Sequence, residues 1–427
     1  WNIPYAFTNE DLMVCRKQLK IFVEDYDEIP YKVLNYVGAE VNYGGRVTDD
    51  KDSRLIKTIL KNFICPEMMN DGHKLSSSGF YYVIEPGTKE DYIEYIKQLP
   101  LNPMPEAFGL HENAEITTSQ NETIALLQNV LSMQPRAASG TGKTREEIIG
   151  ELAADLEKQT PPVFNLEMVS KAYPTSYEES MNTVLFQECV RYNRLLHDMS
   201  ITLKQVQKAL VGEVVMSEEL EKMADAIFDN NVPPSWTSKG FLSLKPLGSW
   251  IQDCNARIDF LNAWINKGTP KVYWISGFFF PQAFLTGTLQ NYARKNTIAV
   301  DKLSFGYDVK DQITHLDIKE KPESGCLCYG MYLEGCKWSF ETHKLAESDP
   351  KKIFVDLPLL HLVPYAERAV PDSGIYKCPV YKVLSRTGTL STTGHSTNFV
   401  MWLEIPSDQS EDIWIRAGVA IFLSLRY

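Results

Sequence analysis

The feature that most constrains the fold is a change of pattern at residues 272–295, which read VYWISGFFFPQAFLTGTLQNYARK. Residues 272–280 are too few and too aromatic for an independent helix, and their bulky and β-branched side chains predict a buried strand. Pro281 then stands where the first turn of a helix tolerates proline, and apolar residues follow at helical spacing. The pattern predicts a strand that leads directly into an amphipathic helix.

Before this stretch the apolar residues recur with a helical period. Residues 8–99 predict a bundle of four short helices, with T-x-x-D start signals at Thr8 and Thr88. Prolines between residues 99 and 105 then predict a boundary. The longest later helix is predicted from a cap at Ser176 to about residue 212, and at 1.5 Å per residue it would reach roughly 50 Å. That length suggests a strut.

After residue 303 the sequence favours short strands separated by turns. The predicted strands are residues 303–309, 325–333, 352–355, 359–363, 375–381, 397–405 and 417–424. Strands at this spacing are typical of a sandwich or partial barrel. The predicted fold class is therefore α+β, with a helical bundle at 1–105, a helical subdomain at 106–270, and a β-sandwich or incomplete β-barrel at 271–427.

Charge and hydropathy exclude several classes of partner. Lysine and arginine number 43 against 55 for aspartate and glutamate, which gives a net charge of −12 without a basic block. Nucleic acid is therefore not an expected partner, and neither is direct binding of this piece to an acidic track such as a microtubule. The longest apolar runs, residues 272–280 and 418–425, are far shorter than the roughly 20 residues that cross a bilayer, so no membrane span is expected.

The cysteines and the first residues bear on compartment and completeness. Eight cysteines are spread along 427 residues without a dense framework, which favours a reducing compartment. The first residues, WNIPYAFTNEDL, lack a basic region followed by an apolar core, so no signal peptide is expected. They also lack a methionine and resemble the middle of a fold, which suggests a piece of a longer chain.

Four segments carry a resemblance to a known family. They are residues 272–295, residues 378–405 (CPVYKVLSRTGTLSTTGHSTNFVMWLEI), NYGGRVTDD at 42–50 and LPLNPMPEAFGLHENAEI at 99–116. These segments resemble the C-terminal region of dynein heavy chains, the second of them most closely the axonemal members, and the resemblance covers nearly the whole chain. It implies that residues 1–105 are the helical lid of the sixth AAA+ module. Residues 106–270 and 271–427 would then be the helical and β-rich halves of the C-terminal domain.

The resemblance also implies a function. The parent would be an ATP-driven, minus-end-directed microtubule motor of the axoneme in cilia and flagella, a cytoplasmic and cytoskeletal protein that uses ATP and Mg and contains a coiled coil. The partners implied are other AAA+ modules of the same heavy chain, with intermediate chains, light chains and microtubules reached through the parent. This piece would be non-catalytic and hold no cofactor, and it would buttress the ring and modulate transmission between modules. A non-motor scaffold module is the alternative.

Residues 139–144, SGTGKT, imitate a phosphate-binding loop in which Lys143 and Thr144 would contact nucleotide. The first glycine of that motif would be residue 137, which is alanine, and residues 125–133 predict a helix where the motif needs a strand. Thr144 with Glu147 also reads as a helix-capping box. A loop before a capped helix is the favoured interpretation. The alternative is a stand-alone P-loop nucleotide-binding protein that uses Lys143 and Thr144.

Arg46 follows two glycines and precedes three aspartates. The lids of AAA+ modules often carry a phosphate-sensing arginine near the start of a helix, and Arg46 stands in a similar place, where a guanidinium suits bidentate phosphate contact. The other interpretation is an arginine that fixes the turn by pairing with Asp49, Asp50 or Asp52. We favour this structural role because the sixth module of dyneins resembles a degenerate unit that does not hydrolyse ATP.

Three further sets of residues imitate functional sites. A metal set would combine Cys326, Cys328, Cys336 and His343, but C-x-C lacks the C-x-x-C geometry usual for zinc. A hydrolytic triad would combine Ser391, His395 and Asp408, but no G-x-S-x-G surrounds the serine. The aromatic residues between 273 and 280 imitate a ligand cage. We expect core or edge cysteines, a polar loop and an aromatic core instead, with no catalytic or metal site.

Overall fold

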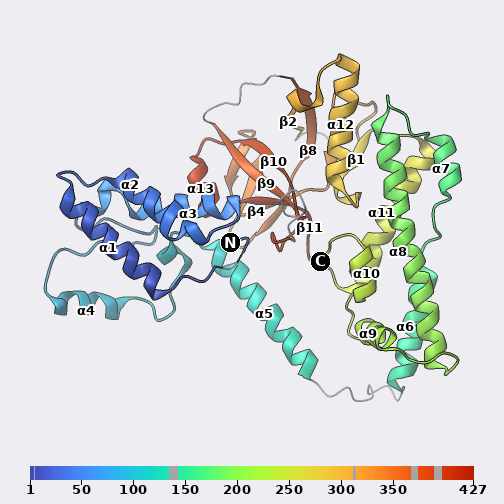
Figure 1. The fold of residues 1–427 in the computed structure, drawn as a ribbon, viewed down its shortest axis with the longest axis horizontal. Coiled ribbons are helices and arrows are strands. Elements are labelled where there is room, and N and C mark those ends of the chain that lie inside the picture. The colour runs from blue at the N-terminus through green and yellow to red at the C-terminus, as the bar shows by residue number, and fades with distance from the viewer. Residues whose placement is uncertain (4, 134–142, 311–313, 367–373, 389–396) are drawn as a thin grey trace. The chain divides into compact units, whose positions relative to one another are not determined.

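The computed structural model describes residues 1–3, 5–133, 143–310, 314–366, 374–388 and 397–427 (Figure 1). The chain divides into two compact units. Unit 1 comprises Trp1–Met133 and Gln409–Val419, and unit 2 comprises Gln134–Asp408 and Ala420–Tyr427. Unit 1 therefore receives a short segment from near the C-terminus of the chain.

Unit 1 is built from helices. These are α1 (Asn9–Asp25), α2 (Tyr31–Tyr36), α3 (Asp50–Phe63), α4 (Lys89–Gln98), α5 (Asn113–Met133) and α13 (Glu411–Arg416). The predicted start signals are confirmed, because Thr8 and Thr88 each form a capping box at the start of α1 and α4. A π-helical turn at Val37–Asn42 prolongs α2. The sequence did not predict α13.

The helices of unit 2 surround one central helix. They are α6 (Arg145–Gln159), α7 (Leu166–Ala172), α8 (Ser180–Leu210), α9 (Glu218–Phe228), α10 (Pro234–Lys239), α11 (Leu247–Lys267) and α12 (Pro281–Asn296). α8 contacts each of the others, and twelve of its 31 residues are buried. Its N-cap is Glu179 and not the expected Ser176. α8 is therefore the core helix of unit 2. A role as a strut, suggested by its length, stays a prediction.

The predicted change from strand to helix is present, but the strand is shorter than expected. β1 spans Val272–Trp274, and a 3-10 turn at Ile275–Gly277 replaces the rest of the predicted strand. Side chains satisfy the backbone there: Tyr192 donates a hydrogen bond to the Gly277 carbonyl, and a carboxylate of α8 accepts two backbone N–H groups further on. Because these groups are paired outside a sheet ladder, the segment can be buried without being a strand.

The remaining strands form three open sheets. They are β2 (Ser304–Lys310), β3 (Cys326–Tyr329), β4 (Tyr332–Glu334), β5 (Cys336–Ser339), β6 (Lys344–Glu347), β7 (Phe354–Asp356), β8 (Leu359–Tyr365), β9 (Ile375–Val383), β10 (Phe399–Pro406) and β11 (Ala420–Ser424). The sheet orders are β1-β3-β8-β2, β10-β9-β11-β4-β7 and β5-β6. The α+β class is confirmed. Among the described strands none of the sheets closes into a barrel.

The core of unit 2 is rich in aromatic side chains. Phe278 stacks on Phe284 of α12 at a centroid distance of 4.6 Å, and Phe241 stacks on Trp250 of α11 at 5.2 Å. The expectation that the aromatic residues near β1 belong to a core is met by Tyr273 and Phe278, which are buried, but not by Phe280, which is 39% exposed. None of the helices in the described ranges has the length and hydropathy of a membrane span.

Candidate functional site

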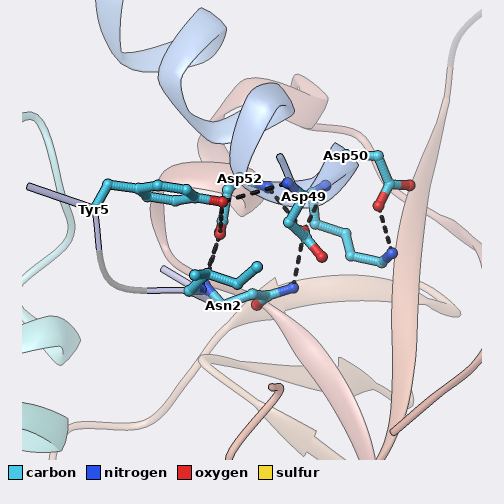
Figure 2. A network of polar contacts seen from close by, with 7 residues as sticks. Asn2, Tyr5, Asp49, Asp50 and Asp52 are labelled. Carbon is cyan, nitrogen blue, oxygen red and sulfur yellow. Dashed lines mark hydrogen bonds and ion pairs between the residues drawn. The ribbon is translucent and has the colours of Figure 1, made fainter. Parts of the chain in front are cut away.

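A buried carboxylate on α3 organises the start of unit 1 (Figure 2). Asp52 is 2% exposed and accepts hydrogen bonds from the backbone N–H groups of Asn2 at 2.7 Å and Ile3 at 3.0 Å. The hydroxyl of Tyr5 donates a third hydrogen bond at 3.0 Å. Burial raises the pKa of Asp52, and the two backbone hydrogen bonds oppose that rise. Asp52 therefore ties the first residues to α3.

The neighbouring aspartates have local tasks. Asp49 is the N-cap of α3 and accepts from the backbone N–H groups of Lys51 and Asp52. The side-chain amide of Asn2 also donates to Asp49, at 3.2 Å (Figure 2). Asp50 pairs with the ammonium group of Lys51. The acidic run that follows Arg46 in sequence thus caps a helix and anchors the N-terminal segment.

Arg46 lies in a 3-10 turn, Gly44–Arg46, just before α3. Its guanidinium is 3.0 Å from Asp11 of α1, and its side chain is 48% exposed. A hydrogen bond from the Thr8 backbone and the nearby Arg46 together lower the pKa of Asp11. An ion pair was expected for Arg46, but the partner named from sequence was wrong: it is Asp11, and not Asp49, Asp50 or Asp52. The sequence-based prediction chose partners close to Arg46 in the chain, but the 3-10 turn that carries Arg46 brings its guanidinium to α1.

The first of the two glycines before Arg46 is required by a close approach. A Cβ atom on Gly44 would lie 1.6 Å from the carbonyl oxygen of Ala39, in the π-helical turn. A Cβ atom on Gly45 would meet nothing within 4 Å. Gly44 therefore lets the turn that carries Arg46 pack against the preceding helix.

The residues that imitate a phosphate-binding loop are only partly described. Residues 139–142 lie outside the described residues. Thr144 is the N-cap of α6 and forms a capping box with Glu147, whose carboxylate accepts the Thr144 N–H at 2.8 Å. Lys143 pairs with Glu151 of α6. Residues 113–133, which precede the loop, form the helix α5 and not the strand that a phosphate-binding loop follows.

The other sets that imitate sites are not assembled among the described residues. Cys326 and Cys328 lie on one side of β3 with their sulfurs 3.8 Å apart, and both are buried free thiols. In the described part of the chain no group of three or more His, Cys, Asp or Glu could hold a metal ion. Ser391 and His395 lie outside the described residues, and Asp408 pairs with Lys344.

Sequence reasoning missed a set of buried charges in unit 2. Glu188 of α8 is 1% exposed and accepts the backbone N–H groups of Phe279 and Phe280, which immediately precede α12. Arg191, one turn along α8, lies 3.8 Å from the same carboxylate. Burial raises the pKa of Glu188, and its hydrogen bonds and Arg191 oppose the rise. Glu188 therefore fixes the start of α12 to α8.

A second buried pair lies on α11. Arg257 is 3% exposed and donates a hydrogen bond to Asp253 at 3.0 Å, and its guanidinium lies 4.0 Å from the ring centroid of Phe241. Lys245 lies 3.5 Å from the same aspartate. A guanidinium that is both paired and stacked on an aromatic ring can be buried at low cost. This pair joins α11 to the segment before it.

Lys382 of β9 brings a second cation toward Glu188. Its ammonium group lies 5.4 Å from the ring centroid of Phe280, and the guanidinium of Arg191 lies 5.0 Å from the same centroid. Burial lowers the pKa of Lys382 to about 8, while the charge of Glu188 opposes the decrease. The three charges thus connect α8, the start of α12 and β9.

These charges hold elements of unit 2 together. Two hollows in unit 2, of about 430 and 530 Å³, are lined by other residues. One signal in the sequence could have found the buried charges. Glu188 stands among the apolar residues of α8, between Leu185 and Tyr192, and Arg257 stands likewise on α11, so each is an ionisable residue on a buried helical face.

Comparison with known proteins shows which family the chain belongs to. The family model for the AAA lid domain of dynein heavy chains matches residues 1–114, and the family model for the C-terminal domain of dynein heavy chains matches residues 120–423. The chain belongs to the dynein heavy chain family.

Its similarity to individual relatives extends over its whole length. It is 50% identical over 428 residues to dynein axonemal heavy chain 1 of Mus musculus and to that of Homo sapiens, which covers 100% of this chain and 10% of each relative. It is 45% identical over 425 residues to dynein axonemal heavy chain 3 of Homo sapiens, with the same coverage. The chain spans about a tenth of the length of these relatives.

Proposed function

We propose that this chain is the C-terminal part of an axonemal dynein heavy chain and that it works without catalysing a reaction. Residues 1–105 form the lid of the sixth AAA+ module, and residues 106–270 and 271–427 form the helical and β-rich halves of the C-terminal domain. The observation that carries the proposal is the succession of two dynein heavy chain models along nearly the whole chain, with 50% identity to an axonemal relative.

The role of this part is to buttress the ring of AAA+ modules and to modulate how ATP-driven rearrangement is transmitted. In the proposal the parent is a minus-end-directed microtubule motor in the axoneme of cilia and flagella. ATP and Mg bind in other modules of the parent, and intermediate chains, light chains and microtubules are reached through it. The net charge of −12 supports a piece that does not grip nucleic acid or the microtubule itself.

The surface of α1 supports a partner from the same heavy chain. No side chain of α1 is buried within the described structure, although the helix carries several large apolar residues. Leu12, Met13, Val14, Leu19, Ile21 and Val23 are each 43% to 55% exposed. A helix that is apolar and uncovered marks an interaction surface. We propose that other AAA+ modules of the parent cover it.

A motor assay tests the proposal. The intact heavy chain is compared with the same chain truncated after residue 114, where the lid match ends, for ATP hydrolysis and for microtubule gliding velocity. We expect hydrolysis to persist, because ATP binds elsewhere, and gliding velocity to change. Identical hydrolysis and gliding in both proteins would favour the non-motor scaffold and contradict the modulating role.

Calorimetry tests the stand-alone nucleotide-binding alternative. The 427-residue chain is titrated with MgATP and MgADP, beside the variant Lys143→Ala. We expect no micromolar binding by either protein, because Thr144 and Lys143 are engaged by α6. Micromolar binding that is lost in Lys143→Ala would replace the motor-fragment proposal by a nucleotide-using module.

A further inference from the structure

The boundary between the two family matches differs from the boundary between the two units. The C-terminal domain match covers residues 120–423 without interruption, yet residues 409–419 within it belong to unit 1. This segment contains α13, which packs against α3. A piece of the C-terminal domain sequence is therefore built into the lid.

Opposite charges line the contact between α3 and α13. Arg54 of α3 lies 3.2 Å from Glu411, and the Thr58 hydroxyl lies 3.2 Å from the carboxylate of Asp412. Lys61 lies 3.8 Å from Asp412. Spacings of four and three residues place Arg54, Thr58 and Lys61 on one face of α3. That face is complementary to the acidic first turn of α13.

Backbone and apolar contacts complete the docking of α13. The N–H of His111, near the end of the lid match, donates to the carbonyl of Arg416 at 3.3 Å. Trp414 is 1% exposed and Ile415 is 7% exposed. Because Trp414 and Ile415 are buried, α13 is a docked element and not a surface loop.

Short connections attach α13 to a sheet of unit 2. α13 lies between β10, which ends at Pro406, and β11, which begins at Ala420. Both strands pair with β9, one on each side. At roughly 3.5 Å per residue, the chain from Pro406 to Glu411 reaches at most about 18 Å. A displacement of α3 beyond that reach must move the sheet or undock α13.

We propose that α13 is the tie through which the lid and the β-rich half of the C-terminal domain move together. This inference rests on the proposed function, because it names the element that transmits rearrangement. The tie is held partly by ion pairs that are open to solvent in part: the side chain of Arg54 is 23% exposed and that of Glu411 is 43% exposed. Pairs of this kind are weak and sensitive to salt, so the contact can be released and remade.

Hydrogen exchange of the 427-residue chain tests the contact itself. Arg54→Glu and Glu411→Arg are each expected to speed the exchange of the α13 amides severalfold, and the double variant with both changes is expected to restore slow exchange. The matched control is Lys57, which lies on the same helix, α3, and pairs with Glu40 in the preceding π-helical turn. Lys57→Glu should leave α13 exchange unchanged. Unchanged exchange in Arg54→Glu, or an equal effect of Lys57→Glu, would overturn the inference.

A measurement on the unaltered chain guards against variants that fail to fold. Raising the salt concentration from 50 mM to 1 M should speed the exchange of α13 amides more than that of α8 amides, because α8 is held by buried apolar contacts. Equal responses of α13 and α8 would contradict a charged, releasable tie.

The motor assay separates this inference from the proposed function. In the intact heavy chain, Arg54→Glu and Glu411→Arg should each change gliding velocity, and the double variant should restore it. If α13 exchange responds as expected while gliding does not, α13 transmits nothing and the inference fails. The proposed function is then judged by the truncation after residue 114, because that change removes the whole C-terminal domain match and not the α13 contact alone.

Discussion

α1 in unit 1 and α8 in unit 2 carry the same kind of apolar repeat but have opposite surroundings. α8 buries twelve of its residues, among them Tyr192, Leu196 and Leu203, whereas no residue of α1 is buried. Both are real helices with N-terminal caps, so the repeat identified the element correctly in each case. The difference teaches that an amphipathic period predicts an apolar helix face that packs against a partner. It does not tell whether that partner lies in the same unit or in another part of a larger protein.

The two units also differ in how polar groups stabilise them. In unit 1, Asp52 and Asp49 anchor the first residues, and ion pairs attach α13 to α3. In unit 2, the charges of Glu188 and Arg257 are enclosed by an aromatic and aliphatic core. Unit 2 therefore has the larger buried core of its own. We expect substitutions in its interior to have the larger effects.

The largest contrast is expected for leucines of the two helices. Leu203 of α8 is 0% exposed and Leu19 of α1 is 45% exposed. Leu203→Ala should lower the free energy of unfolding by about 4 kcal/mol, because it removes a packed side chain and leaves a cavity. Leu19→Ala should change it by less than about 0.5 kcal/mol.

Urea unfolding followed by tryptophan fluorescence measures the first effect, since six of the eight tryptophans lie in unit 2. Hydrogen exchange in α1 and α3 measures the second. Equal losses for Leu203→Ala and Leu19→Ala would remove the contrast between the units.

A smaller loss of folding stability is expected when Glu188 is replaced. Glu188→Ala removes the acceptor of two backbone N–H groups, which remain buried before α12, and should cost about 3 kcal/mol. The matched control is Glu178→Gln, a substitution at an exposed position just before α8, which should change stability by less than about 0.5 kcal/mol. Tryptophan fluorescence in urea reports both. Wild-type stability of Glu188→Ala would refute a clamping role for this carboxylate.

In unit 1 the two glycines before Arg46 provide a matched pair. Gly44→Ala forces a methyl group against the carbonyl of Ala39 and should destabilise unit 1 by about 2 kcal/mol. Gly45→Ala has open space around the new methyl group and should be close to neutral. Hydrogen exchange of the α3 amides distinguishes them. Similar exchange in both variants would show that the turn can shift to accept a side chain.

The smallest effect concerns the dependence of stability on pH. Because burial lowers the pKa of Lys382 to about 8 in the folded chain, folding favours its neutral form. The unfolded chain binds more protons between pH 8 and about 10.4, so this group makes the free energy of unfolding rise with pH in that window. Lys382→Met should abolish the rise and increase stability at pH 7, where the folded chain holds the buried ammonium group in its charged form.

Unfolding in urea at pH 7, 8, 9 and 10 measures this slope. Lys377→Met is the control, because this lysine lies on the same strand with an exposed position and should leave the slope unchanged. A slope that is the same with and without Lys382 would mean that another group causes the pH dependence.

Much of the fold followed from local patterns. The T-x-x-D signals placed the starts of α1 and α4. Elements without a local signal were missed: the short strands β5 and β6, and α13, whose six residues are too few for a helical period. The predicted strand at 272–280 was too long because Tyr192 and Glu188, distant in sequence, satisfy its backbone.

The sequence by itself determined most of the longer elements, the caps of α1 and α4, and the family, because these depend on neighbouring residues and on motifs that stand in order along the chain. Only the tertiary structure decided the partners: Asp11 for Arg46, the start of α12 for Glu188, and α3 for α13. Each of these contacts joins residues far apart in sequence. Their strength comes from burial and from complementary charge, and both exist only after the chain has folded.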